Sequence, residues 1–84
     1  MNHTIYVDAD FTLPQDLPKP GPKDLAETFD VSADYFDHEK PVRPVDGKPG
    51  TWRAGVKGSN AHGMTQQHPG KINVNRDDFY VKPN

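Results

Sequence analysis

Cysteine is absent from the 84 residues, which excludes disulfide bonds, thiolate metal sites, iron-sulfur clusters and cysteine nucleophiles. Serine is scarce as well, because only Ser32 and Ser59 are present and neither lies in a G-x-S-x-G nucleophile motif. No glycine is followed by the Lys-Ser or Lys-Thr pair of a phosphate-binding loop. We therefore expect a protein that is not an enzyme.

Large apolar residues are also few. Leu, Ile, Val and Phe make up 16 of the 84 residues, about 19%, which lies just under the compositional limit typical of disordered chains. Small domains with so little apolar surface often depend on a disulfide, a metal or a partner. The composition therefore predicts a mostly irregular, extended chain with little core of its own, a short helical segment at about 22–40 and a few short β-strands.

Charge divides the chain into two halves. Residues 1–46 form an acidic, proline-rich half with ten acidic and four basic residues, a net charge of −6. Residues 47–84 form a basic, glycine-rich half in which six basic residues face two acidic ones, a net charge of +4. The asymmetry indicates either two contact surfaces of different preference or two halves that attract each other.

The helical signal lies between two proline-rich spacers, Thr12–Pro22 and Pro41–Gly50. Pro22 suits a first helical position, and Leu25 and Phe29 fall four residues apart on one helix face. Ser32 then suits the cap of a second turn, which must end before Pro41. We predict two short helices at a kink, each too short to be stable without a surface to lie on.

One family resemblance falls on this helical segment, residues 24–40, with the sequence DLAETFDVSADYFDHEK. It resembles a stretch near the C-terminal end of lambda-repressor-like helix-turn-helix domains, and it matches that stretch at Leu25, Ala26, Phe29, Val31, Ser32, Asp34 and Tyr35. In that family the stretch packs behind the DNA-reading helices, and the helices that would precede it are not expected here. The resemblance implies a helix at 24–40 and no function.

Strands are predicted at both ends and near the middle. Residues 4–11 place Ile5, Val7, Ala9 and Phe11 on one face of a strand. Residues 71–81 predict a second strand, interrupted at 75–78, and residues 51–57 a weaker third. Residues 58–70 show no apolar period and are predicted to form a polar loop.

Two patterns invite a metal site, and neither has the spacing that a metal requires. The chain has four histidines (His3, His38, His62 and His68), which lack the helical or tight-turn spacing of a zinc site. Asp8 and Asp10 fall on the same side of the first strand, as in some cation-binding enzymes, but those enzymes need a far larger fold. We expect solvated histidines, an exposed polar strand face, and no metal or other cofactor.

These observations favour an extended, non-enzymatic accessory protein that binds the protein subunits of a larger assembly. We expect a capsid cement or minor structural protein of a phage or virus, in the virion or the cytoplasm, neither secreted nor membrane-bound. Its expected anchors are the aromatic residues Tyr6, Phe11, Phe29, Tyr35, Phe36, Trp52, Phe79 and Tyr80.

Two alternatives belong to other classes. One is a small inhibitor or regulator of a host enzyme, bound through the helix or by strand addition. The other is a nucleic-acid-binding accessory that uses the acid-free segment 47–76, in which Trp52 would stack on a base. Its basic contacts would be Lys48, Arg53, Lys57, Lys71 and Arg76.

Overall fold

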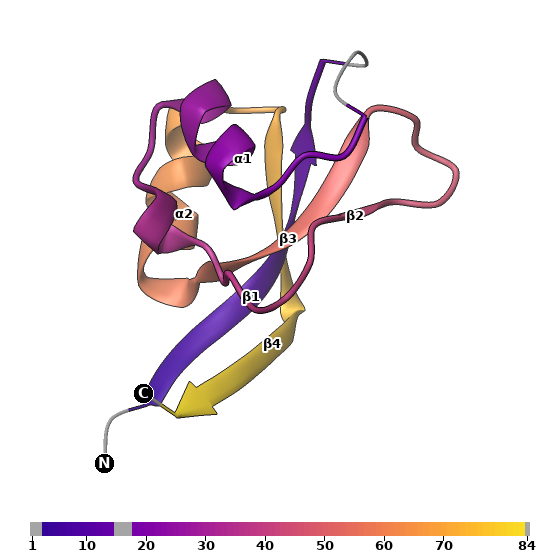
Figure 1. Cartoon of the computed structure of the whole chain (residues 1–84). Helices are drawn as coiled ribbons and strands as arrows, with labels where there is room; N and C mark the ends of the chain where they lie inside the picture. Colours follow the sequence, from indigo (N-terminus) through magenta and orange to yellow (C-terminus); the bar gives the residue numbers. More distant parts are fainter. Residues whose placement is uncertain (1–2, 15–17, 84) are drawn as a thin grey trace.

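A four-stranded antiparallel sheet with two helices on one face organises the chain (Figure 1). The computed structural model describes residues 3–14 and 18–83. In chain order its elements are β1 (His3–Thr12), α1 (Pro22–Phe29), the 3-10 helix η1 (Ala33–Tyr35), β2 (Arg43–Pro44), β3 (Thr51–Lys57), α2 (Gly58–Gln67) and β4 (Ile72–Pro83).

The strand order is β2-β3-β1-β4, so β1 is central and pairs with β3 on one side and β4 on the other. Phe11 is paired with Trp52 and Ile72, and Ala9 with Ala54 and Val74. Because side chains alternate between the two faces of a strand, these residues share one face. That face carries the apolar side chains predicted for the first strand.

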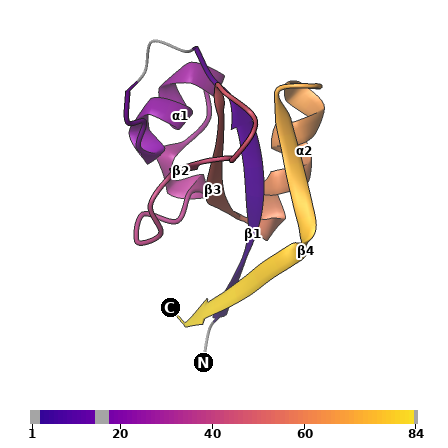
Figure 2. The same cartoon turned by 90° about the vertical axis from the view of Figure 1, so that its right-hand side faces the viewer.

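Both helices cover this apolar face, as the two views in Figures 1 and 2 show. Helix α1 buries Leu25, Ala26 and Phe29, and α2 buries Ala61 and Met64. The rings of Phe29 and Phe36 each lie within 5.7 Å of the Phe11 ring, centroid to centroid. The buried core consists of Ala9, Phe11, Leu13, Leu25, Ala26, Phe29, Phe36, Ala54, Val56, Ala61, Met64 and Ile72.

The local signals around the first helix behave as predicted. Pro22 is its first residue, and the Gly21 N–H donates to Asp24 Oδ2 at 2.7 Å. Ser32 caps η1 by accepting a hydrogen bond from the Asp34 N–H at 3.1 Å. The expectation of two short helices at a kink within 22–40 is therefore confirmed.

Residues 37–42 form an arch over the other, polar face of the sheet. The chain pairs with the edge of β3 at Phe36 and again at Arg43, and the residues between leave the ladder. The arch begins at Asp37, whose N–H donates to the Gly55 carbonyl at 2.9 Å. It brings Asp37, Glu39 and Lys40 above strands that lie far away in the sequence.

β4 contains a bulge that changes its direction. Asn75 pairs with Asp8, but the next residue of β1, Val7, pairs with Phe79, so that Arg76, Asp77 and Asp78 are extra residues. Beyond this bulge, His3–Val7 of β1 pairs with Phe79–Pro83 of β4 and leads away from the body, which Figures 1 and 2 show at the end bearing both termini. Tyr6 and Val7 also pair with β3, and the segment is two-stranded beyond them. We call His3–Val7 and Phe79–Pro83 the arm.

The prediction of a mostly irregular, extended chain with little core is wrong. The Cα radius of gyration is 12.1 Å, the value of about 12 Å expected for a compact chain of this length. Alternation gathers the few apolar residues onto one sheet face, and most prolines fall in connections or, as with Pro22, at the start of a helix. The acidic and the basic halves both contribute to this one sheet, because β1 lies between β3 and β4.

The predicted polar loop at 58–70 is wrong as well, because residues 58–67 form α2. This helix lacks a regular apolar period and buries only Ala61 and Met64, one turn apart. These two buried side chains are enough to hold the helix in place, because it connects β3 to β4 and lies on strands β1, β3 and β4. No helix in the described ranges 3–14 and 18–83 is long and apolar enough to cross a membrane.

Candidate protein-docking surface

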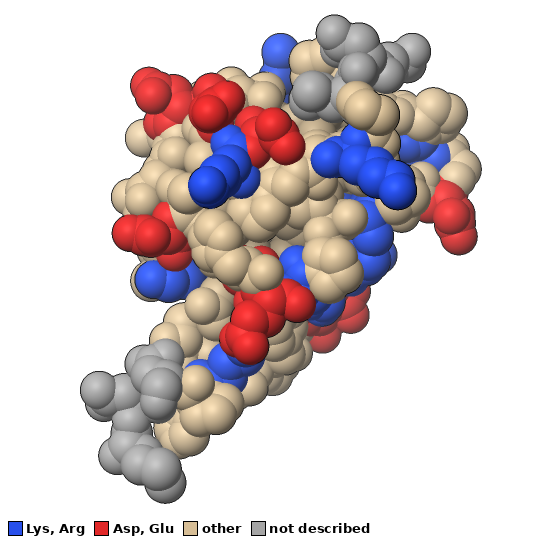
Figure 3. Space-filling model, viewed as in Figure 1, with Lys and Arg blue, Asp and Glu red and all other residues tan. Residues whose placement is uncertain are grey.

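The arm exposes three large apolar side chains on one face. Ile5, Phe79 and Val81 are 54%, 62% and 50% exposed. Ile5 is paired with Val81 and Val7 with Phe79, so all three belong to the sheet face that the helices cover farther along. We call Ile5, Phe79 and Val81 the apolar patch. In Figure 3 the arm appears mostly as uncharged residues.

The cover ends where α2 begins. A side-chain carbon added at Gly58, the first residue of α2, would lie 3.3 Å from the Ile5 carbonyl oxygen and 3.7 Å from its Cγ2. The helix therefore touches the arm at Ile5, and the three side chains of the patch remain at least half exposed. An apolar patch that continues a covered core face is typical of a surface that receives a partner.

The opposite, polar face of the arm is held by contacts within the chain. The Tyr6 and Tyr80 rings are stacked with centroids 5.6 Å apart. The Tyr80 hydroxyl donates to Asp37 Oδ2 at 2.8 Å, and Lys82 Nζ donates to Asp37 Oδ1 at 2.8 Å and also to Glu39 Oε1. The arch thus fastens this face of the arm, and the apolar patch alone points outward.

These contacts shift the pKa values of the groups that make them. Burial acts to raise the pKa of Asp37, but hydrogen bonds from Lys82, Tyr80 and the Glu39 backbone, together with the Lys82 charge, outweigh it and hold that pKa below 3.8. Burial and the hydrogen bond to Asp37 raise the pKa of Tyr80. Hydrogen bonds to Asp37 and Glu39 raise the pKa of Lys82. The charged Asp37 is therefore favoured by the folded chain.

The Asp8 and Asp10 pair lies on the polar sheet face, where basic side chains occupy both carboxylates. Lys40 Nζ and Arg43 Nη2 each lie 3.1 Å from an Asp8 oxygen, and Arg53 binds Asp10 through two hydrogen bonds of 2.7 and 3.1 Å. Among the described residues no group of three or more carboxylates and histidines is placed to hold a metal. Asp10 therefore joins the acidic half to the basic half, whereas Asp8 pairs with basic residues of its own half.

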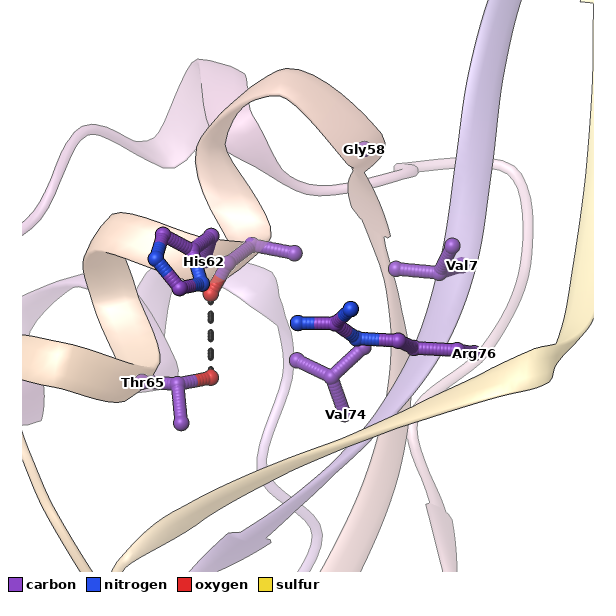
Figure 4. Close-up of a pocket in the computed structure, with 7 residues that line it drawn as sticks. Val7, Gly58, His62, Thr65, Val74 and Arg76 are labelled. Carbon is purple, nitrogen blue, oxygen red and sulfur yellow. Dashed lines mark hydrogen bonds between the residues drawn. The ribbon is translucent and has the colours of Figure 1, made fainter.

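A groove lies beside the root of the arm, between α2 and the sheet (Figure 4). Its volume is ≈ 490 Å³. The Arg76 side chain extends from the β4 bulge toward α2, over Val7 and Val74. The Arg76 guanidinium makes no ion pair or hydrogen bond with any residue in the described part of the chain. The lining residues are Val7, Gly58, Ala61, His62, Thr65, Val74 and Arg76.

A second hollow of ≈ 700 Å³ meets this groove at Gly58 and includes Ile5 and Lys57. Arg76 is the arginine that lines the groove, and no acidic residue lines it. Lys57 lines the second hollow but pairs with Tyr6 in the sheet, and it also lines a hollow on the polar face with Asp34, Asp37 and Glu39. The groove beside the arm therefore combines apolar surface with the positive charge of Arg76.

The predicted aromatic anchors lie in different environments. Phe11, Phe29 and Phe36 are buried in the chain's own core, at most 3% exposed. Tyr35 and Trp52 pack against that core, and Tyr6 and Tyr80 stack on each other. Phe79 is the one predicted anchor on the apolar patch. Its partners Ile5 and Val81 were missed as contact residues, although the alternation had placed Ile5 on one strand face, because the sequence does not indicate where the helices stop covering it.

The predicted basic contacts are not brought together. Arg53 is engaged by Asp10, Lys48 lies in the connection from β2 to β3, and Lys71 precedes β4. Only Lys57 and Arg76 border the same joined hollows. In the view of Figure 3, positive and negative residues are interspersed over the body.

The four histidines are also apart. His38 Nε2 lies 2.8 Å from the Ala33 carbonyl oxygen, and the His68 ring meets the edge of Phe29 at 5.2 Å between centroids. His62 borders the groove and His3 the second hollow.

No protein-family model, curated protein or solved structure matches the chain. The case for function therefore depends on this surface.

Proposed function

We propose that the protein is a small, non-enzymatic binding protein that attaches to a larger protein partner through its arm. The observation that carries the proposal is the apolar patch, where three large side chains at least half exposed lie side by side on one face. Large apolar residues that project together from a folded body are the usual anchors of protein interfaces. Partner binding would remove them from water.

The arm has the construction of a docking element. Its polar face is fastened to the body by Asp37, so little conformational freedom is left to lose on binding. Burying apolar surface contributes about 25 cal/mol per Å². Because a fixed arm loses little conformational entropy on binding, most of the free energy of this burial would contribute to affinity.

The compact fold favours the inhibitor or regulator over the extended accessory protein that was expected first. An accessory protein that reaches across many subunits needs an extended chain, whereas this chain has a radius of gyration of 12.1 Å. A small inhibitor or regulator that docks by one projecting element fits that size. Attachment to a phage or virus capsid remains a prediction, without the extended form that was expected for it.

Enzymatic and nucleic-acid functions receive no comparable support. Ser32 is occupied as a helix cap, and Asp8, Asp10 and Asp37 are each neutralised by basic side chains. A phosphate backbone requires several free cations along one track. Here Arg53 is paired with Asp10, and Lys48 and Lys71 border neither hollow.

Affinity capture with the immobilised full chain tests the proposal. The wild-type protein is compared with a triple variant of the patch, Ile5→Thr, Phe79→Thr and Val81→Thr, in which threonine keeps the β-propensity of each site. Asn73→Thr, an exposed change within the body, is the matched control. We expect a protein retained by wild type and by the control and lost by the triple variant.

Circular dichroism must show the same fold in all three proteins. The captured partner is then purified and titrated against each of them by calorimetry. We expect at least a tenfold weaker Kd for the triple variant, because each buried large apolar side chain contributes roughly 1.5 to 3 kcal/mol. A partner that binds the folded triple variant as tightly as wild type would contradict the proposal.

A further inference from the structure

The three extra residues of the β4 bulge leave unchanged which sheet face the residues after them occupy. Asn75, before the bulge, lies on the polar sheet face with its partner Asp8, and Phe79, after it, lies on the apolar face with Val7. A strand without the three extra residues would therefore still alternate correctly between the two faces. Bulges often occur beside functional sites, where they direct a side chain.

What this bulge directs is Arg76. Its guanidinium extends over Val7 and Val74 into the groove, opposite His62 and Thr65 of α2 (Figure 4). Among the described residues Asp78 forms no ion pair with it, and the Asp78 charge is the smallest of the causes that raise the pKa of Arg53 on the polar face. A cation without a carboxylate partner thus faces an apolar floor, which is the arrangement that complements a carboxylate next to apolar groups.

The apolar surface continues from Arg76 along the arm at regular spacing. Val7 and Phe79 form the first pair beyond the bulge, and Ile5 and Val81 form the second. Successive side chains on one strand face lie about 7 Å apart. The second hollow, which shares Gly58 with the groove, includes Ile5 of this row.

We propose that the groove and the arm bind an extended segment of the partner protein that places a carboxylate at Arg76 and apolar side chains at alternate positions along the arm. This inference rests on the proposed function and specifies the kind of partner. A peptide fits better than a small apolar acid because the patch is an open face, whereas small-molecule sites enclose most of their ligand. The carboxylate is either an Asp or Glu side chain or the C-terminus of the segment.

Random ten-residue peptides displayed on phage, selected on the full-length protein, provide the probe. Enriched peptides are synthesised with a fluorescent label and titrated by fluorescence anisotropy against wild type, Arg76→Gln, the patch triple variant and Lys48→Gln. Lys48→Gln removes the same charge from an exposed site away from both hollows and is the matched control. Each peptide is also made with Asp or Glu replaced by its amide, and with an amidated C-terminus.

We expect enriched peptides with alternating apolar residues and a carboxylate. Arg76→Gln should weaken the Kd by about tenfold, the scale of one charge-assisted hydrogen bond, and Lys48→Gln should leave it unchanged. Replacing the carboxylate by an amide should weaken wild-type binding equally and have no further effect on Arg76→Gln. The side-chain amides and the C-terminal amide distinguish the two sources of the carboxylate.

Different results separate this inference from the proposed function. Peptides that lose binding to the triple variant but bind Arg76→Gln as they bind wild type would overturn the carboxylate assignment and leave the docking arm intact. Peptides that bind the folded triple variant unchanged would count against both. Failure to enrich any peptide, or a solution dimer that dissociates in the triple variant, would overturn the inference, because a second copy would then occupy the arm.

Discussion

Asp37 is the residue that ties the arm to the body. It is 4% exposed and accepts hydrogen bonds from Tyr80, Lys82 and the Glu39 backbone. The same carboxylate therefore joins β4 to the arch on the polar face of the sheet. Tyr80 and Lys82 lie more than 40 positions from Asp37 in the sequence. No local sequence pattern therefore indicates these contacts.

Stability should depend on pH through this residue. The pKa of Asp37 is lowered below 3.8, so its contribution is present above that pH and is lost as the pH falls through the folded-state value. The pKa values of Tyr80 and Lys82 are raised above 10.0 and 10.5, so their contributions are present below those values and are lost as the pH rises. Urea unfolding from pH 2 to pH 11 measures the loss of unfolding free energy at the acidic and at the alkaline end.

Asp37→Asn should reduce the loss of unfolding free energy at both ends of the pH range. We expect the difference in unfolding free energy between wild type and this variant to be constant from about pH 5 to pH 9 and to shrink beyond both ends. Asp46→Asn, an exposed change in the connection from β2 to β3, is the control and should follow the wild-type curve. A constant difference over the whole range would show that the ionisation of Asp37 does not stabilise the arm.

Gly55 is required by the same cluster. A side-chain carbon at this position would overlap the Tyr80 hydroxyl and lie 3.2 Å from Tyr80 Cζ and 3.3 Å from Asp37 Cβ. Gly55→Ala should therefore destabilise the fold by about 1 to 3 kcal/mol in urea unfolding, the usual cost of overpacking.

Gly63→Ala is the matched control for that substitution. Gly63 lies in α2 with nothing within 4 Å of an added carbon, so alanine there should stabilise the helix by roughly 0.5 to 1 kcal/mol. Opposite signs for the two glycines are expected. A neutral Gly55→Ala would mean that Tyr80 can leave Asp37 without cost.

At the scale of elements, the β4 bulge separates the body from the arm, and we expect strand pairing not to require it. Deleting residues 76–78 should join Asn75 to Phe79 in correct alternation. We expect the deletion variant to fold, with an unfolding free energy at least equal to that of wild type and a β-sheet circular dichroism spectrum.

The deletion should nevertheless remove function, because it removes Arg76. Peptides selected on wild type should bind the deletion variant at least about tenfold more weakly. Arg76→Gln in the full-length chain is the comparison, since it removes the charge and keeps the bulge. A deletion variant that fails to fold would show that the bulge stabilises the sheet.

The elements differ in how far the sequence predicts them, and the difference has physical causes. β1 and β3 were predicted within one residue at each end, because alternation and β-branched residues act locally. The predicted interruption at 75–78 coincides with the bulge at Arg76–Asp78. α2 was missed because its two apolar contacts, Ala61 and Met64, make a helix only when strands lie beneath them.

The docking surface was only partly predictable for a similar reason. Alternation placed Ile5 and Val7 on one strand face, but exposure depends on where α2 begins. The aromatic residues offered as anchors were identified by type, and Phe11, Phe29 and Phe36 fill the core instead. A residue type marks an anchor only after burial is known.

At the scale of the whole molecule, the opposite charges of the two halves act within the chain. Asp10 binds Arg53, and Asp37 and Glu39 bind Lys82, so acidic residues of the first half meet basic residues of the second. Exposed ion pairs contribute little individually. Asp8 and Asp37, however, have side chains only 9% and 3% exposed, and leaving either unpaired would be costly.

The isolated chain should therefore be a compact, cooperatively folded monomer. Its core is small, but it is shared by the central strand β1, the flanking strands and both helices, so that no half can retain its packing alone. Small-angle scattering should give a radius of gyration near the 12.1 Å of the Cα atoms, increased slightly by hydration. An unfolded chain of this length would give about 29 Å.

Thermal unfolding followed by far-ultraviolet circular dichroism and by Trp52 fluorescence should show one transition with the same midpoint. Trp52 packs against the core from β3, so it reports tertiary packing while circular dichroism reports the sheet and helices. Leu25→Ala, which truncates a fully buried residue of α1, should lower both midpoints together. Separate midpoints, or a radius close to the unfolded value, would mean that the core is completed only by a partner, and the arm would then be part of a larger folding interface.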